Sequence, residues 1–191
     1  MKKIILASAS PRRKELLEQI GLEFDIDPSN CEEEMLSDIQ PHELARSLSL
    51  QKASQVAGSY SNAIIIAADT FIVFGDKLMG KAHTEAEARE MLTALNGNPH
   101  SVITGFTILD TEKNNTVSNS VETKVHFRKM TSGEIESYVA SGEPLGKAGA
   151  YAIQGLGSVI VKEIEGDYSN VVGLPLTALA EALREFGVNI L

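Results

Sequence analysis

The sequence contains a single cysteine, Cys31, among its 191 residues. One cysteine excludes an intramolecular disulfide, and a chain that needs none fits a reducing compartment. No apolar run approaches the ~18 residues that span a bilayer. The apolar stretch after Met1, Lys2 and Lys3 soon gives way to Ser8 and the arginines that follow it, which is not the pattern of a signal peptide. We therefore expect a cytoplasmic protein without a membrane partner.

Positive charge is also scarce. Lys and Arg number 17 against 26 Asp and Glu, and the formal net charge is −9. Nucleic acids and acidic membranes favour a broad basic surface, so the charge argues against both as partners. Any anion must bind in a local basic pocket. The four histidines lack an H-x-x-x-H spacing, and a zinc centre is therefore not expected.

Hydrophobic residues make up 43% of the chain, which is enough for a globular core, and no repeat or coiled coil interrupts the pattern. Strands are expected at residues 3–7, 22–26, 63–68, 71–74, 77–79, 100–109, 116–128 and 158–164, and helices at 12–20, 41–57, 84–95, 131–141 and 174–186. This mixture predicts an α/β protein with a mixed sheet, in which the long hairpin 100–128 forms a second lobe.

The turn before the first helix combines a helix-start signal with positive charge. Ser10 and Pro11 are a good N-cap and first-turn pair, which local structure alone explains. The cations Arg12, Arg13 and Lys14 oppose the helix dipole by ~0.3–1 kcal/mol each. An anion in the turn would reverse this effect, because amides, hydroxyls and guanidinium groups would converge on phosphate oxygens. The alternative is a solvated basic patch balanced by nearby glutamates.

Two acidic features are candidates for ligand or metal binding. Asp69 follows the most hydrophobic segment, 63–68, and carboxylates at strand ends commonly face the ligand crevice; the alternative is a turn residue that caps the backbone. The run Glu32–Glu34 usually indicates a solvated loop. Paired with Asp69, it could instead hold Mg²⁺, which needs only one or two carboxylates when phosphates and water complete its shell.

Lys52 and Lys81 could neutralise phosphate charge, although each taken singly is more often a surface residue. Residues 75–81 match the P-loop spacing G-x-x-x-x-G-K, but Ala82 stands where a serine or threonine would bind Mg²⁺. A P-loop also joins a strand to a helix, whereas a hairpin is expected here. A P-loop kinase or ATPase is therefore a poor alternative.

Together these motifs resemble the Maf family of nucleoside triphosphate pyrophosphatases. The matching segments are residues 6–13, 32–33, 51–53, 67–70, 80–81, 149–155 and 171–176. The resemblance implies a single domain over residues 1–191 with an elongated, two-lobed Maf/ITPase-like α/β fold. Helices flank its twisted sheet, the second lobe spans about 70–130, and the site lies in the cleft between the lobes.

The resemblance also implies a hydrolase, a nucleotide diphosphatase that cleaves the α–β phosphoanhydride bond with Mg²⁺ or Mn²⁺ and releases a monophosphate and pyrophosphate. Asp69 looks like the residue that activates water, and Glu33 like its partner in holding the metal. The residues that would handle the polyphosphate are Ser8, Ser10, Arg13, Lys52 and Lys81.

Arg12, Thr70 and Gln154 resemble the residues of the family branch that acts on dTTP and UTP. The expected substrates also include modified pyrimidine triphosphates. The Gln154 amide offers a donor and an acceptor to a pyrimidine edge, although the residues alone favour a turn amide that bonds the backbone. Gly146 and Ala82 depart from the family pattern, which usually has aspartate and proline there, so loop geometry and base choice are less well defined.

The family's older name, septum-formation inhibitor, suggests a different class of function. In that alternative the chain is a nucleotide-binding regulator of cell division with residual catalysis. The resemblance also leaves a homodimer open.

Overall fold

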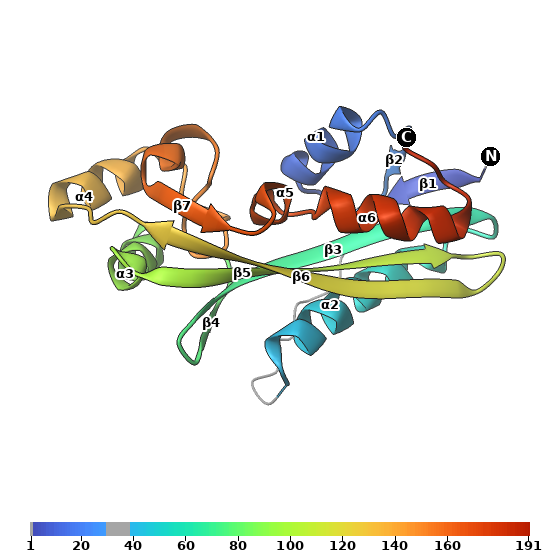
Figure 1. The fold of residues 1–191 in the computed structure, drawn as a ribbon, viewed down its shortest axis with the longest axis horizontal. Helices are drawn as coiled ribbons and strands as arrows, with labels where there is room; N and C mark the ends of the chain where they lie inside the picture. Colours follow the sequence, from blue (N-terminus) through green and yellow to red (C-terminus); the bar gives the residue numbers. More distant parts are fainter. Residues whose placement is uncertain (1, 30–38) are drawn as a thin grey trace. The chain divides into compact units, whose positions relative to one another are not determined.

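The computed structural model describes residues 2–29 and 39–191, and in this part of the chain seven strands form one mixed sheet (Figure 1). The strands are β1 Lys3–Leu6, β2 Asp25–Ile26, β3 Ala63–Phe74, β4 Lys77–Met79, β5 Pro99–Asp110, β6 Asn115–Phe127 and β7 Val161–Glu165. Their order is β2-β1-β3-β5-β6-β7, with β4 paired to β3. β1 is parallel to β2 and β3, whereas β3–β4 and β6–β7 are antiparallel. The predicted α/β class with a mixed sheet is confirmed.

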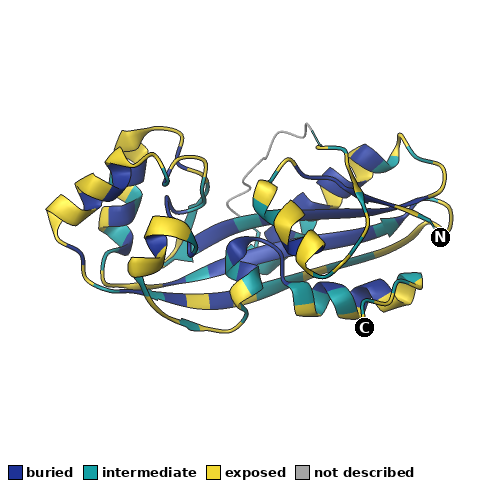
Figure 2. Cartoon of the chain, turned by 90° about the horizontal axis from the view of Figure 1, so that it is seen from above, coloured by how far each residue is buried: buried dark blue, intermediate teal, exposed yellow. Residues whose placement is uncertain are grey.

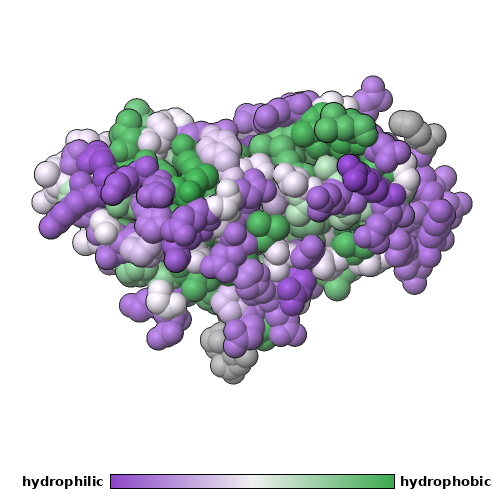
Figure 3. Space-filling view, in the orientation of Figure 1, coloured by the Kyte–Doolittle hydropathy of each residue, from purple (hydrophilic) through white to green (hydrophobic). Residues whose placement is uncertain are grey.

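Helices lie between and after these strands in the sequence. They are α1 Pro11–Gln19, α2 Pro41–Ala57, α3 Glu85–Leu95, α4 Ser132–Ala140, α5 Tyr168–Val172 and α6 Leu176–Leu183, with 3₁₀ helices η1 Gly155–Val159 and η2 Arg184–Phe186. Thr84 and Thr131 begin α3 and α4 with complete capping boxes, which confirms the predicted caps. None of the described helices has the length and apolar character to cross a membrane. Hydrophilic side chains cover most of the face drawn in Figure 3.

Five sequence predictions were wrong in detail. β2 covers only Asp25–Ile26 of the expected strand 22–26. β3 does not stop at Asp69 but continues through it to Phe74. Residues 155–159 form η1, and β7 starts only at Val161. No helix was expected between the strand 158–164 and the last helix, but α5 forms there, and the Asp167 carboxylate accepts hydrogen bonds from the Ser169 and Asn170 amides. The last helix begins only at Leu176, after Pro175, and its final residues form the 3₁₀ helix η2, which ends at Phe186 as expected.

The chain divides into two compact units. The first unit comprises Met1–Asp69, Thr104–Val121 and Gly173–Leu191, and the second comprises Thr70–Ile103 and Glu122–Val172. Residues 104–121 of the β5–β6 hairpin therefore belong to the first unit. The second unit extends beyond residue 130, to Val172.

The core of the first unit forms around β3. Residues 63–69 are all buried, as expected for a strand covered on both faces (Figure 2). Ile5 and Ile65, on the paired strands β1 and β3, pack in one cluster with Ala53 and Val56 of α2. This packing fixes α2 against the strands that carry the candidate site.

The core of the second unit contains a buried histidine. His100 is only 3% exposed, and its Nε2 lies 2.9 Å from the hydroxyl of Tyr151. The rings of Tyr151 and Phe127 meet His100 edge to face. Burial lowers the pKa of His100 from 6.5 to about 4, against a smaller opposing effect of the Asn98 backbone. The folded state therefore keeps this ring neutral at pH values where the unfolded chain protonates it.

We expect this histidine to make stability pH-dependent. The contribution of the neutral His100 ring to the free energy of unfolding is complete above pH 6.5 and is lost as pH falls toward 4. The reason is that only the unfolded state binds the proton between these pH values. The lowered pKa corresponds to roughly 3 kcal/mol of stability. Urea unfolding at about pH 7.5 and about pH 4.5 measures this loss of stability. His100→Gln should lose less stability on acidification than the wild type, whereas the exposed His83→Gln should match it. Equal losses in all three proteins would contradict the assignment.

Candidate functional site

The side chains of Ser8 and Ser10 accept hydrogen bonds within the turn between β1 and α1. Ser10 caps the helix, accepting a hydrogen bond from the Arg13 amide at 3.5 Å, and Pro11 occupies the first turn. The predicted cap is thus confirmed. The Ser8 hydroxyl accepts from the Ser10 amide at 3.3 Å and from Arg13 Nη1 at 3.1 Å. A hydroxyl that accepts two bonds keeps its own O–H to donate, so Ser8 can donate to an anion.

Arg13 folds back over this turn instead of extending into solvent. Its Nη1 donates to Ser8, and its Nε donates to the Gly173 carbonyl at 2.9 Å. Gly173 has φ 129°, in the region that favours glycine. Lys14 behaves differently, because it is exposed and pairs with Glu18 at 3.6 Å. The solvated-patch interpretation therefore holds for Lys14 but not for Arg13; Arg12 is half-buried.

Asp69 and Lys52 form a buried ion pair. Lys52 Nζ of α2 donates to Asp69 Oδ1 of β3, and the two residues are 8% and 4% exposed. The interpretation of Lys52 as a surface residue is wrong. The pair holds the Asp69 carboxylate in one orientation. It also explains why β3 continues through a charged residue, since a buried charge needs a partner.

The register of β1 and β3 brings the turn and Asp69 to the same region of the first unit. Leu6 pairs with Ile66 in parallel, and the Ala7 amide donates to the Ile66 carbonyl at 2.8 Å. The turn starts two residues beyond Leu6, and Asp69 lies three residues beyond Ile66. Ligands in α/β sheets bind outside the carboxyl ends of parallel strands, and the turn lies at that end of β1. Asp69 lies within β3, just beyond the part of this strand that pairs with β1.

The backbone of α2 approaches β5 closely, and this contact helps to position Lys52. A Cβ atom on Gly105 would lie 2.0 Å from the Ala45 carbonyl oxygen. One turn along α2, the hydroxyls of Ser49 and Thr107 lie 2.8 Å apart. Lys52 follows Ser49 by three residues, so it lies on the same side of the helix.

The remaining predicted residues belong to the second unit. Thr70 is half-buried on β3, and Lys81 is exposed and forms a β-bridge with Ala148. Gln154 precedes η1 and is partly exposed, and its side chain makes no cap bond to that helix. The Gln154 side chain therefore does not cap η1.

The two departures from the family pattern are neighbours in the structure. The Gly146 amide donates to the Ala82 carbonyl at 2.8 Å, and the Ala82 amide donates to the Lys147 carbonyl at 3.2 Å. Proline at position 82 could not make the second bond. Gly146 has φ 73°, which glycine adopts readily. Both residues thus fit the bridge that holds Lys81.

The predicted metal ligand Glu33 lies outside the described residues, as do Cys31 and the rest of the acidic run. Among residues 2–29 and 39–191, no three His, Cys, Asp or Glu side chains gather in a way that could hold a metal ion. Asp69 offers one carboxylate, a hard oxygen donor. This fits Mg²⁺ or Mn²⁺ if phosphate oxygens and water supply the other ligands.

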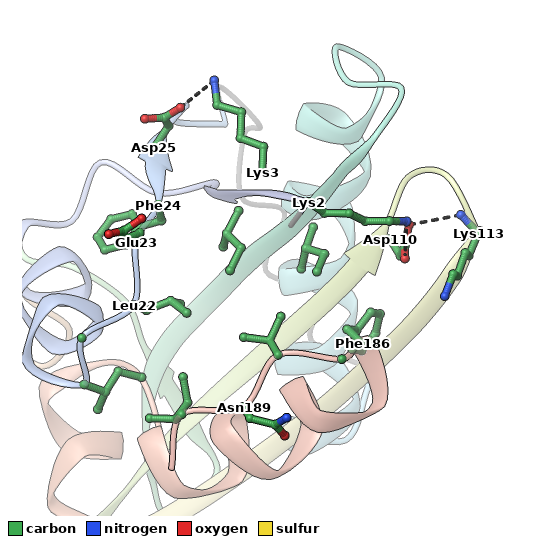
Figure 4. A pocket seen from close by; sticks show the side chains of 17 residues that line it. Lys2, Lys3, Leu22, Glu23, Phe24, Asp25, Asp110, Lys113, Phe186 and Asn189 are labelled. Atoms are coloured by element: carbon green, nitrogen blue, oxygen red, sulfur yellow. Dashed lines mark hydrogen bonds and ion pairs between the residues drawn. The ribbon is translucent and has the colours of Figure 1, made fainter.

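A separate hollow of about 960 Å³ lies in the first unit near the amino end of β1 (Figure 4). Lys2 donates to Asp110 at 2.6 Å on its wall, and Lys3 pairs with Asp25 at 2.6 Å. Apolar side chains such as Phe186 complete the lining. None of the predicted site residues that the structure describes lines this hollow.

Sequence reasoning did not single out two of these contributors. The Gly173 carbonyl lies 160 positions from Arg13, and no periodicity reports such a contact. Gly105, inside a strand, is a signal that could have been found, because an isolated glycine there often marks the close approach of another backbone.

Known proteins resemble this chain over its whole length. The dTTP/UTP pyrophosphatase of Bacillus cereus (strain ATCC 10987 / NRS 248) is 48% identical over 190 residues, covering 100% of this chain and 93% of the relative. That of Bacillus mycoides (strain KBAB4) is 48% identical, covering 100% and 98%. Among solved structures, the Staphylococcus aureus Ham1 protein matches with a TM-score of 0.52 at 11% identity, over 98% of this chain and 100% of that one, which is a likeness of fold. The family model described as Maf-like protein matches residues 3–186, and the chain belongs to the Maf family.

Proposed function

We propose that this protein is a cytoplasmic nucleoside triphosphate pyrophosphatase that hydrolyses dTTP and UTP to the monophosphate and pyrophosphate. The observation that carries the proposal is the serine and arginine turn at the carboxyl end of β1, together with the buried Asp69–Lys52 pair just beyond the paired part of the neighbouring parallel strand β3. The names of relatives 48% identical to this chain support the choice of substrate.

In this proposal the turn binds the triphosphate. The Ser8 hydroxyl and the Arg13 guanidinium are prearranged by their mutual hydrogen bond, so little side-chain entropy is lost on binding. Ser10 and Lys52 add donors, and Lys81 is proposed to neutralise phosphate charge. Catalysis of phosphoryl transfer depends mainly on such positioning and charge neutralisation.

Asp69 is proposed to accept a proton from the attacking water, whose oxygen bonds to the α-phosphorus as the bond to the pyrophosphate oxygen breaks. Lys52 orients the carboxylate for this step. A divalent cation, held by Asp69 with Glu33, would neutralise charge on the phosphate oxygens when bound. Arg12, Thr70 and Gln154 are proposed to select pyrimidine bases, modified ones included.

A panel of nucleoside triphosphates tests the proposal. With Mg²⁺ or Mn²⁺ present, the wild type should release pyrophosphate from dTTP and UTP faster than from purine substrates. Release of inorganic phosphate instead would show cleavage at another bond. The absence of pyrophosphate from every substrate would refute the proposed function.

Arg13→Ala should lower kcat/KM for UTP about 100-fold, because the variant loses charge-assisted hydrogen bonds to phosphate. Lys14→Ala is the matched control, since it removes an exposed cation from the same helix end. Its kcat/KM should stay within about twofold of the wild type. Arg13→Lys should recover only part of the activity, because an ammonium cannot reproduce the planar fork of donors. Equal losses of kcat/KM in Arg13→Ala and Lys14→Ala would contradict the proposed role of Arg13 in phosphate binding.

A further inference from the structure

One carboxylate, that of Glu143, holds the segment that follows Gln154. Glu143 Oε2 accepts a hydrogen bond from the Leu156 amide at 2.9 Å, and Oε1 accepts from the Gly157 amide at 2.8 Å. Both amides belong to the first turn of η1, which starts directly after Gln154. Glu143 thus serves as the anion at the start of this short helix.

Tyr138 extends the same network to the other side of Gln154. Its hydroxyl donates to Glu143 Oε1 at 2.8 Å and accepts from the Ala152 amide at 3.1 Å. The backbone two residues before Gln154 and two to three residues after it is therefore bound to one Tyr138–Glu143 pair. Gln154 lies between these anchors, and its side chain is partly exposed.

Two glycines make this close approach sterically feasible. A Cβ atom on Gly155, which has φ 69°, would lie 2.4 Å from Glu143 Oε2. A Cβ atom on Gly157 would lie 2.0 Å from the Ala152 carbonyl oxygen and 2.7 Å from the Tyr138 hydroxyl. Side chains at positions 155 and 157 would therefore prevent the Tyr138–Glu143 pair from packing against this segment.

Glu143 carries its negative charge while it accepts these hydrogen bonds. Burial raises its pKa, but the amides of Leu156 and Gly157 and the Tyr138 hydroxyl together lower it further, so the net pKa lies below the usual value. The side chain is consequently an ionised acceptor at neutral pH, and its hydrogen bonds are charge-assisted.

We propose that Glu143, together with Tyr138, is a positioning residue that fixes Gln154 for recognition of the pyrimidine base. This inference rests on the proposed function, in which Gln154 contacts the base. Glu143 itself acts only through the backbone on both sides of Gln154. Its loss should weaken binding of the nucleoside part of the substrate and leave pyrophosphate binding unchanged.

The test compares UTP with pyrophosphate, a ligand without a base. Glu143→Gln keeps the side-chain size but replaces an acceptor oxygen by an NH₂ group that faces backbone N–H donors. We expect calorimetry without a divalent cation, so that UTP is not hydrolysed, to show UTP affinity reduced roughly tenfold, as for the loss of a well-placed hydrogen bond, with pyrophosphate affinity unchanged. Tyr138→Phe removes one hydroxyl and should give a smaller change of the same kind.

Glu136→Gln is the matched control, because Glu136 lies on α4 in the same unit, half exposed in an ion pair with Arg89. In a Gln154→Ala background, Glu143→Gln should add little further loss of UTP affinity, because its effect passes through Gln154. Equal losses for UTP and pyrophosphate, or full additivity with Gln154→Ala, would overturn the inference. A wild type that binds UTP without releasing pyrophosphate would refute the proposed function while leaving this comparison informative.

Discussion

Asp69→Asn should lower kcat for UTP hydrolysis by about 10³-fold, the range that a positioned general base contributes. Asparagine has nearly the same shape as aspartate but cannot accept the proton of the attacking water at neutral pH. KM should change much less, because the serine and arginine turn remains intact. Initial rates of pyrophosphate release over a range of UTP concentrations separate the two effects.

The same substitution should also cost stability, and this cost has to be separated from catalysis. Asp69 and Lys52 are both buried, and removing one charge of a buried pair typically costs about 3–5 kcal/mol. Replacing both charges, as in Lys52→Met with Asp69→Asn, should recover much of the stability but none of the activity. Urea unfolding of both variants gives the fraction folded under assay conditions.

Asp76→Asn is the matched control, because Asp76 lies exposed in the turn between β3 and β4. It should have wild-type kcat and stability. If folded Asp69→Asn retained kcat within about tenfold of the wild type, Asp69 would not be the base, since the expected range starts near 10²-fold.

Local rules explain why the opening turn was predictable. A serine N-cap, a proline in the first turn and opposing cations all act within a few residues, so the sequence shows them together. The capping boxes at Thr84 and Thr131 were predictable for the same reason. The hairpin of β3 and β4 likewise confirmed that residues 75–81 are not a P-loop.

The features that could not be predicted depend on contacts between residues far apart in the sequence. Asp69 was expected to end its strand, because a charge within an apolar run favours a boundary. Lys52, 17 residues earlier on α2, makes the buried carboxylate tolerable and lets β3 continue. Glu143 was not predicted, because the backbone amides that it binds lie 13 and 14 positions away along an irregular segment.

Gly105→Ala should destabilise the protein by roughly 3–5 kcal/mol, which for a chain of this size corresponds to a fall in Tm of about 10 °C. The new Cβ atom would meet the Ala45 carbonyl oxygen at 2.0 Å and the Arg46 amide nitrogen at 2.8 Å. These are backbone atoms, so no side-chain rotation relieves the clash. α2 would have to move away from β5.

Movement of α2 would also reach the candidate site, because it would stretch the Ser49–Thr107 contact and shift Lys52 relative to Asp69. The folded fraction of Gly105→Ala should therefore have a reduced kcat as well as a lower Tm. Gly133→Ala is the control, since Gly133 lies on α4 with nothing within 4 Å of an added Cβ. Alanine there should raise stability by roughly 0.5–1 kcal/mol. Similar melting of the two variants would show that α2 and β5 do not need this close backbone contact.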